Sequence, residues 1–156
     1  MNEFRPGGFF QLCASLFESA ALPVRIGLTT LVTLLVVILS VTPGSDLPND
    51  NVFIWLIATT PSLIQNLMHI VAYALLATMW VWSLNSLGTP RGRLLTAAFA
   101  TVAMGIILEA CQIYVAGRYA TLLDVLMNVS GSLMGIALAR QWQNWRSSAQ
   151  LQPRAE

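Results

Sequence analysis

Apolar side chains occur along this chain in long runs, separated by short segments that hold most of the charged residues. A helix that crosses the hydrocarbon core of a bilayer needs about 20 largely apolar residues. We therefore predict four spans, at about Ile26–Val41, from Thr60-Pro61 to about Leu84, at about Leu94–Val115 and at about Ala120–Ala139. In the second span, Thr60 is the expected N-cap and Pro61 the expected first helical residue.

Two shorter apolar segments do not fit the spanning pattern. Between Phe9 and Ala20 apolar residues recur at helical spacing, with Gln11, Ser15 and Glu18 on the opposite face, which is typical of a helix lying in the membrane interface. The segment Val52–Ala58 is too short to cross, and we expect it on the outer surface with Trp55 near the headgroups.

The composition agrees with the spanning pattern. Of 156 residues, 56% are hydrophobic and only 10% are charged, and the mean hydropathy is +0.66. This excludes a soluble domain of the same size. We predict an all-α integral membrane protein, a four-transmembrane-helix bundle with an N-terminal interfacial amphipathic helix. Its expected parts are an arm at residues 1–25, a transmembrane domain at 26–140 and a tail at 141–156.

The arginines predict the orientation of the bundle. All eight basic residues are arginine, and the formal net charge of +1 gives no basic surface for nucleic acid. With a cytoplasmic N-terminus, seven arginines face the cytoplasm and only Arg118, in the loop Ala116–Tyr119, faces outward. We therefore expect a multi-pass protein of the bacterial inner membrane with both termini cytoplasmic, and a role for Arg118 in binding or chemistry.

Polar residues recur on one face of three predicted helices, close to their outer ends. At about 100° per residue, Asp124 and Asn128 share a face of the fourth helix with Gly131 and Gly135. The G-x-x-x-G spacing of these two glycines favours close approach of another helix backbone. If all three faces point inward, they form one cluster, whose predicted members are His69, Tyr73, Glu109, Gln112, Arg118, Asp124 and Asn128.

A purely structural role for this cluster is the alternative. Arg118 would then neutralise Glu109 and Asp124, while Asn128 would hydrogen-bond across helices. One histidine beside two acids gives too few ligands for a metal site, so we predict neither a metal nor a cofactor. The chain carries no Ser-His-Asp spacing, CxxC, P-loop or HExxH motif.

An ordered set of motifs resembles the VanZ-like family. The set comprises Asn66-Leu-Met-His69 with Tyr73, Glu109-Ala-Cys-Gln112, Gly117-Arg118, Asp124-Val-Leu-Met-Asn128 and Gly131, and covers about residues 66–139. The resemblance implies a small polytopic membrane protein from a family named for a protein that raises tolerance to teicoplanin. It does not imply a particular biochemical activity.

Two functions from different classes remain open. The first is an outward-facing polar pocket that binds a lipid-linked headgroup or precursor of the cell envelope, with Arg118 pairing a phosphate or carboxylate and with Asn128 and Gln112 supplying hydrogen bonds. Such a protein contributes to envelope integrity or to teicoplanin-type tolerance. The second is a membrane enzyme on an outer-leaflet lipid or cell-wall precursor, with candidate catalytic residues Glu109, His69 and Asp124. The expected partners are membrane lipids, and a homo-oligomer is left open.

The arginine distribution makes the topology testable. Reporter domains fused after Arg93 and after Arg154 should give cytoplasmic signals, because arginine-rich segments stay on the cytoplasmic side. A reporter at Gly117 should give an external signal. A cytoplasmic signal at Gly117 would contradict both the orientation and the outward position of the polar cluster.

Overall fold

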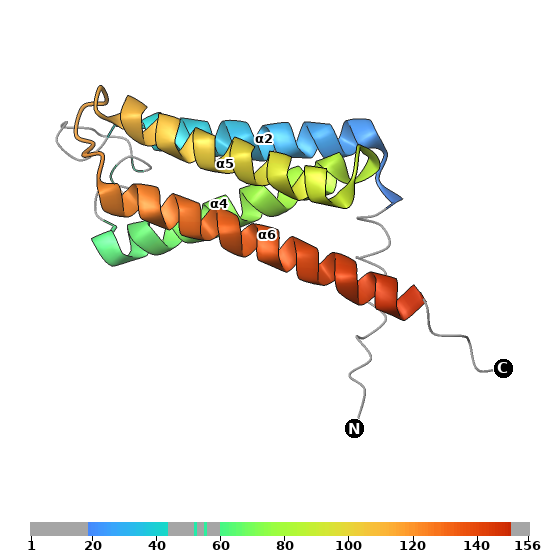
Figure 1. Ribbon diagram of the computed structural model, residues 1–156. Helices are drawn as coiled ribbons and strands as arrows, with labels where there is room; N and C mark the ends of the chain where they lie inside the picture. Colours follow the sequence, from blue (N-terminus) through green and yellow to red (C-terminus); the bar gives the residue numbers. More distant parts are fainter. Residues whose placement is uncertain (1–18, 44–51, 53–54, 56–59, 151–156) are drawn as a thin grey trace.

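The computed structural model describes residues 19–43, 52, 55 and 60–150, and this part of the chain is helical (Figure 1). Each of four α-helices is long and apolar enough to cross a membrane. The described residues include no β-strand, so the predicted all-α transmembrane fold is confirmed. The predicted interfacial helix lies almost wholly outside the described residues, as does most of Val52–Ala58. The elements are α2 (Leu22–Val41), α4 (Ser62–Ser83), the short 3₁₀ helix η1 (Leu84–Ser86), α5 (Pro90–Gln112) and α6 (Leu122–Gln150).

The starts of α2 and α5 differ from the predicted ones in a way that proline explains. Pro23 lies in the first turn of α2, and α5 begins at Pro90, where the Thr89 side chain accepts a hydrogen bond of 3.1 Å from the Gly92 amide. Proline is favoured in a first turn because its φ is already helical and its missing N–H is not needed there. The N-cap role predicted for Thr60 is wrong. Pro61 is itself the N-cap of α4.

The end of the last helix also differs from the prediction. Instead of ending near Ala139, α6 continues through Arg140 to Gln150. Arginine is a good helix former, and neither glycine nor proline occurs between Arg140 and Gln150. A charged residue therefore ends the most apolar part of the sequence without ending the helix, and the expected domain boundary at residue 140 falls inside α6.

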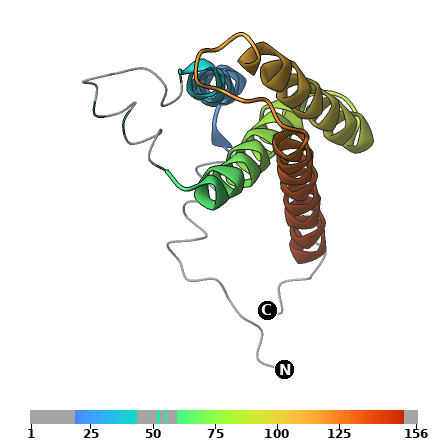
Figure 2. The ribbon, with the colours of Figure 1, turned by 90° about the vertical axis from the view of Figure 1, so that its left-hand side faces the viewer.

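The four long helices alternate in direction (Figure 1). The C-terminal ends of α2 and α5 lie at the same end of the bundle as the N-terminal ends of α4 and α6. Helix α4 contacts each of α2, α5 and α6, and its most extensive contact is with α6. In the view along the bundle, α4 lies between α2 and α6 (Figure 2).

Two glycines of α6 allow its backbone to touch that of α4. A Cβ atom placed on Gly131 would lie 2.9 Å from the Ile70 Cα atom, and one on Gly135 would lie 2.9 Å from the Ala74 Cα atom. Both would come closer still to the carbonyl oxygens of Ile70 and Ala74. The Thr78 hydroxyl also bonds the carbonyl oxygens of Ala74 and Gly135. The close approach predicted from the G-x-x-x-G spacing is therefore confirmed.

The apolar residues divide between a small core and a large outer surface. One core cluster holds Tyr73, Leu76 and Leu108 with Val36, and a second lies toward the other end of the bundle. Large apolar side chains cover the outer surface of all four helices, among them Leu31, Val71, Phe99 and Leu133. Exposing such an apolar surface to water is unfavourable, whereas contact with apolar lipid tails is not. The chain is a multi-pass membrane protein.

The glycine contact can be tested with matched substitutions. Replacing Gly131 or Gly135 by alanine should lower the free energy of unfolding by about 1–3 kcal/mol, because the added methyl group meets backbone atoms that cannot move aside. Gly27 of α2 is the control, because a Cβ there meets nothing within 4 Å. Thermal unfolding in detergent should show losses for Gly131→Ala and Gly135→Ala but none for Gly27→Ala. Equal stability of all three variants would contradict the contact.

Candidate functional site

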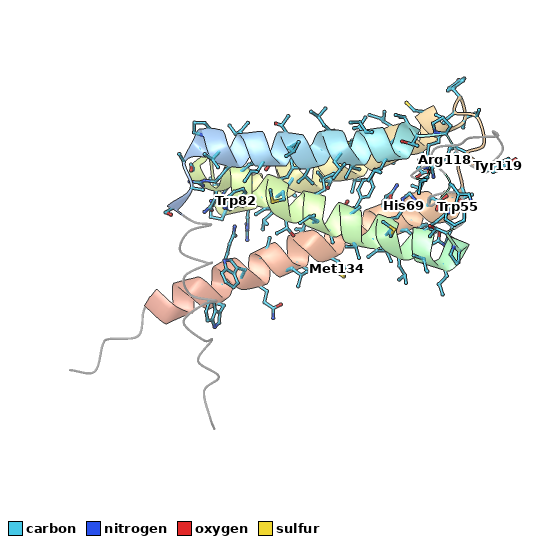
Figure 3. All side chains as sticks on the ribbon, turned by 180° about the vertical axis from the view of Figure 1, so that it is seen from behind. Trp55, His69, Trp82, Arg118, Tyr119 and Met134 are labelled. Carbon is cyan, nitrogen blue, oxygen red and sulfur yellow. The ribbon has the colours of Figure 1, made fainter. Side chains whose placement is uncertain are left out.

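Polar side chains from three helices gather at one end of the bundle. His69 comes from the first half of α4 and Tyr73 from its middle, Glu109 and Gln112 from the end of α5, and Asp124 and Asn128 from the start of α6. His69 lies at the same end as Arg118 of the α5–α6 loop (Figure 3). The antiparallel order of the helices brings these separate segments together. Gln112, Glu109 and Asn128 are buried, with at most 4% of each residue exposed.

Asn128 connects His69 to Glu109. Its side-chain amide donates a hydrogen bond of 3.2 Å to the Glu109 Oε1 atom, and its carbonyl oxygen lies 2.8 Å from the His69 Nδ1 atom. One side chain of α6 therefore joins one of α4 to one of α5. Such a link is favourable inside a membrane because these groups have no bulk water to bond.

Three buried polar atoms of this region have no hydrogen-bond partner in the described part of the chain. They are the Tyr73 hydroxyl, the Glu109 Oε2 atom and the Ser132 hydroxyl. Tyr73 and Asn128 both pack against Gly105. A Cβ atom placed on Gly105 would lie 3.1 Å from the Tyr73 ring and 3.1 Å from the Asn128 Cβ atom. Native proteins pair nearly all buried polar groups, so unpaired atoms concentrated in one region call for an explanation.

Arg118 and Gln112 are attached to the end of α2. The Arg118 guanidinium donates to the carbonyl oxygens of Thr42 at 2.9 Å and Leu39 at 3.1 Å, and the Gln112 amide donates to that of Ser40 at 3.1 Å. The last carbonyls of a helix have no hydrogen-bond partners within the helix. A cation at this end is also stabilised by the helix dipole. Burial lowers the pKa of Arg118, while the charges of Glu109 and Asp124 oppose that shift. The guanidinium remains charged.

Asp124 takes part in starting α6. The Thr121 hydroxyl donates to the Asp124 carboxylate and accepts a hydrogen bond of 3.1 Å from the Asp124 amide. A carboxylate in a first turn is also favoured by the helix dipole. The negative charge of Asp124 also raises the pKa of Arg118. The side chain of Asp124 accepts from Thr121, and not from His69.

The described residues contain no group of three or more His, Cys, Asp or Glu side chains that would hold a metal ion. Cys111, beside Gln112 on α5, is an exposed free thiol. The cluster itself contains five ionisable groups, which are the side chains of His69, Tyr73, Glu109, Arg118 and Asp124.

Sequence reasoning missed two parts of this arrangement. Ser132 is completely buried and lies one turn after Asn128 on the same face of α6, so its spacing would have identified it. The carbonyl groups of α2 that bind Arg118 and Gln112 had no comparable signal. Every residue has a carbonyl, and only the packing of α2 beside the α5–α6 loop selects these three.

The attachment of Arg118 to α2 predicts a stability effect. Arg118→Gln should lower the free energy of unfolding by about 1–2 kcal/mol, because carbonyls at the end of α2 lose a charged donor. Arg91→Gln is the control, because Arg91 is exposed at the opposite end of α5. Thermal unfolding in detergent should separate the two variants. If Arg118→Gln is as stable as Arg91→Gln, the guanidinium does not stabilise α2.

Comparison with known proteins agrees with the family resemblance of the motifs. The sequence profile of the VanZ/LLP1 family matches residues 12–143, which include all four long helices up to Gln143 of α6. The match extends further toward the N-terminus than the motif region at 66–139. No curated protein and no solved structure matches the sequence. A profile match over most of the chain shows that this protein belongs to the VanZ/LLP1 family.

Proposed function

We propose that the polar cluster binds the headgroup of a membrane lipid or of a lipid-linked precursor of the cell envelope. Its members would be His69, Tyr73, Glu109, Gln112, Arg118, Asp124 and Asn128, at the end of the bundle that the arginine pattern predicts to lie outside the cytoplasm. A headgroup would enter the cluster while its lipid chains stay in the bilayer beside the apolar helix surfaces.

The unpaired buried atoms carry this proposal. A buried polar group without a partner costs about 1–3 kcal/mol, and more if it is charged. The Tyr73 hydroxyl and the Glu109 Oε2 atom both belong to this class, although neighbouring groups in the cluster are paired. A ligand with polar groups at the right positions would remove this cost. A cluster that served only packing would instead be expected to pair all of its own members.

Arg118 supports a more limited form of anion binding than the sequence predicted. Its Nε and Nη2 atoms donate to α2 carbonyls, so the usual two-pronged contact with a phosphate or carboxylate would compete with those bonds. We infer that an anionic part of the ligand interacts with the remaining Nη1 group and with the overall positive charge. Arg118 would thus attract the ligand and hold α2 at the edge of the site.

The physiological role that follows is a contribution to envelope integrity or to teicoplanin-type glycopeptide tolerance, exerted at the bacterial inner membrane with both termini cytoplasmic. Family membership and the membrane fold support this role without specifying a ligand. A protein that binds a cell-wall precursor would act where glycopeptides meet their target.

A membrane enzyme is the second candidate, and the link from Glu109 through Asn128 to His69 favours it. Orientation of an imidazole by a carboxylate is common where a histidine acts as a base. Two observations weaken this reading. His69 and Glu109 are joined through an amide, which does not readily pass a proton, and Asp124 bonds to Thr121.

Tyr73→Phe distinguishes a binding site from a packing cluster. The lost hydroxyl has no partner among the described residues, so the stability of the variant should be unchanged or slightly higher. Retention of lipid should fall by about fivefold to tenfold, which corresponds to one lost hydrogen bond of about 1–1.5 kcal/mol. Native mass spectrometry would measure the fraction of purified protein that retains host lipid.

Tyr114→Phe is the control, because Tyr114 is 90% exposed and lies outside the cluster. It should match the wild type in lipid retention, stability and growth on teicoplanin. If Tyr73→Phe also matches the wild type in retention and growth, the cluster serves packing alone and the binding proposal is wrong.

A further inference from the structure

The hydrogen bonds of Asn128 determine which of its side-chain atoms faces His69. The amide nitrogen donates to the Glu109 carboxyl group, so the carbonyl oxygen is directed at the His69 Nδ1 atom. A carbonyl oxygen only accepts hydrogen bonds. The Nδ1 atom must therefore carry a proton to make this contact. In a neutral imidazole, the proton is then absent from Nε2, which becomes an acceptor.

The packing of α6 prevents Asn128 from turning its amide freely. Asn128 is 1% exposed, and it lies one turn before Gly131, whose backbone touches that of Ile70. Ile70 directly follows His69 in α4. The same helix contact therefore fixes both partners of the bond. The His69 ring bonds Asn128 through Nδ1, and the residue is half-buried rather than enclosed.

We propose that Glu109 and Asn128 are positioning residues that keep the proton of His69 on Nδ1, so that Nε2 accepts a hydrogen bond from the ligand. The ligand class, which rests on the binding function proposed above, is a headgroup that presents a hydroxyl or a primary ammonium group. A phosphate oxygen, an ester carbonyl or a quaternary ammonium group cannot donate to Nε2. The unpaired Glu109 Oε2 atom, which in the ionised carboxylate only accepts, favours the same ligands.

The position of the proton on the His69 ring is testable without any ligand, because the chain contains a single histidine. Protein labelled with ¹⁵N-histidine, purified through a tag that lacks histidine, would give one pair of ring nitrogen signals. Spectra are recorded in detergent at a pH where the neutral imidazole dominates. We expect the protonated-nitrogen signal at Nδ1, although neutral imidazole in water favours protonation at Nε2. A protonated Nε2 in the wild-type protein would overturn the proposal.

Two substitutions of Asn128 separate positioning from folding. Asn128→Leu removes the acceptor, so the proton should move to Nε2, whereas Asn128→Asp retains an oxygen acceptor and should keep the proton on Nδ1. Thermal unfolding is measured for both. A folded Asn128→Leu protein with its proton still on Nδ1 would overturn the role of Asn128. If that variant does not fold, the wild-type spectrum and Asn128→Asp still decide the question.

Matched pairs of lipids in nanodiscs test the ligand class. Phosphatidylethanolamine and phosphatidylcholine differ in whether the ammonium group donates, and phosphatidylglycerol and phosphatidylmethanol differ in headgroup hydroxyls at the same charge. We expect the Nε2 signal to shift with phosphatidylethanolamine, phosphatidylglycerol or both, and not with their matched partners. The responding pair identifies an ammonium or a hydroxyl ligand. Equal responses within both pairs would overturn the ligand class.

The proton position on His69 and the binding of a headgroup are contradicted by different results. A protonated Nδ1 together with loss of lipid retention in Tyr73→Phe supports both positioning and binding. A protonated Nδ1 in a protein that retains no headgroup would support the positioning and contradict the proposed function. A protonated Nε2 in a protein that retains lipid through Tyr73 would contradict the positioning alone.

Discussion

Backbone contact between α4 and α6 is the interaction on which the site depends. Gly131 and Gly135 let α6 approach Ile70 and Ala74 so closely that no side chain fits between them. His69 directly precedes Ile70, and Asn128 lies one turn before Gly131. Once the two backbones touch, the imidazole and the amide are brought within hydrogen-bond distance. In lipid, where apolar surfaces gain little by associating with one another, close packing and hydrogen bonds of this kind hold helices together.

The polar cluster combines groups that stabilise the bundle with groups that do not. Asn128 pairs with partners on two other helices, while Gln112 and Arg118 bind carbonyls at the end of α2. Tyr73 is almost completely buried, yet its hydroxyl lacks a partner among the described residues. Buried polar groups of a packing core are normally all hydrogen-bonded, and exceptions are expected at functional sites. The mixture of paired and unpaired groups therefore supports the proposed binding role.

Arg118 connects the cluster to the first span. Its guanidinium bridges the α5–α6 loop to the end of α2, and it is close enough to Glu109 and Asp124 for their charges to act on it. In the proposed function, an anionic part of the ligand would interact with the Arg118 Nη1 group, which donates to neither of these α2 carbonyls. The same Arg118 side chain would then link the proposed ligand to the end of α2.

The amino-acid sequence alone determined the class of the protein and the faces of its helices. Long apolar runs can only be accommodated in lipid, and the helical period places Gly105, Glu109 and Gln112 on one face and Asn128, Gly131 and Gly135 on another, all of which are buried. The sequence did not determine the helix ends, because Pro61 rather than Thr60 is the N-cap of α4 and α6 continues past Arg140. Only the tertiary structure decided which polar groups meet. Asn128 bonds both His69 and Glu109 only because helices that are distant in sequence pack together. Arg118 bonds carbonyl groups of α2 for the same reason. Every residue has a backbone carbonyl, so the sequence does not indicate which carbonyls take part.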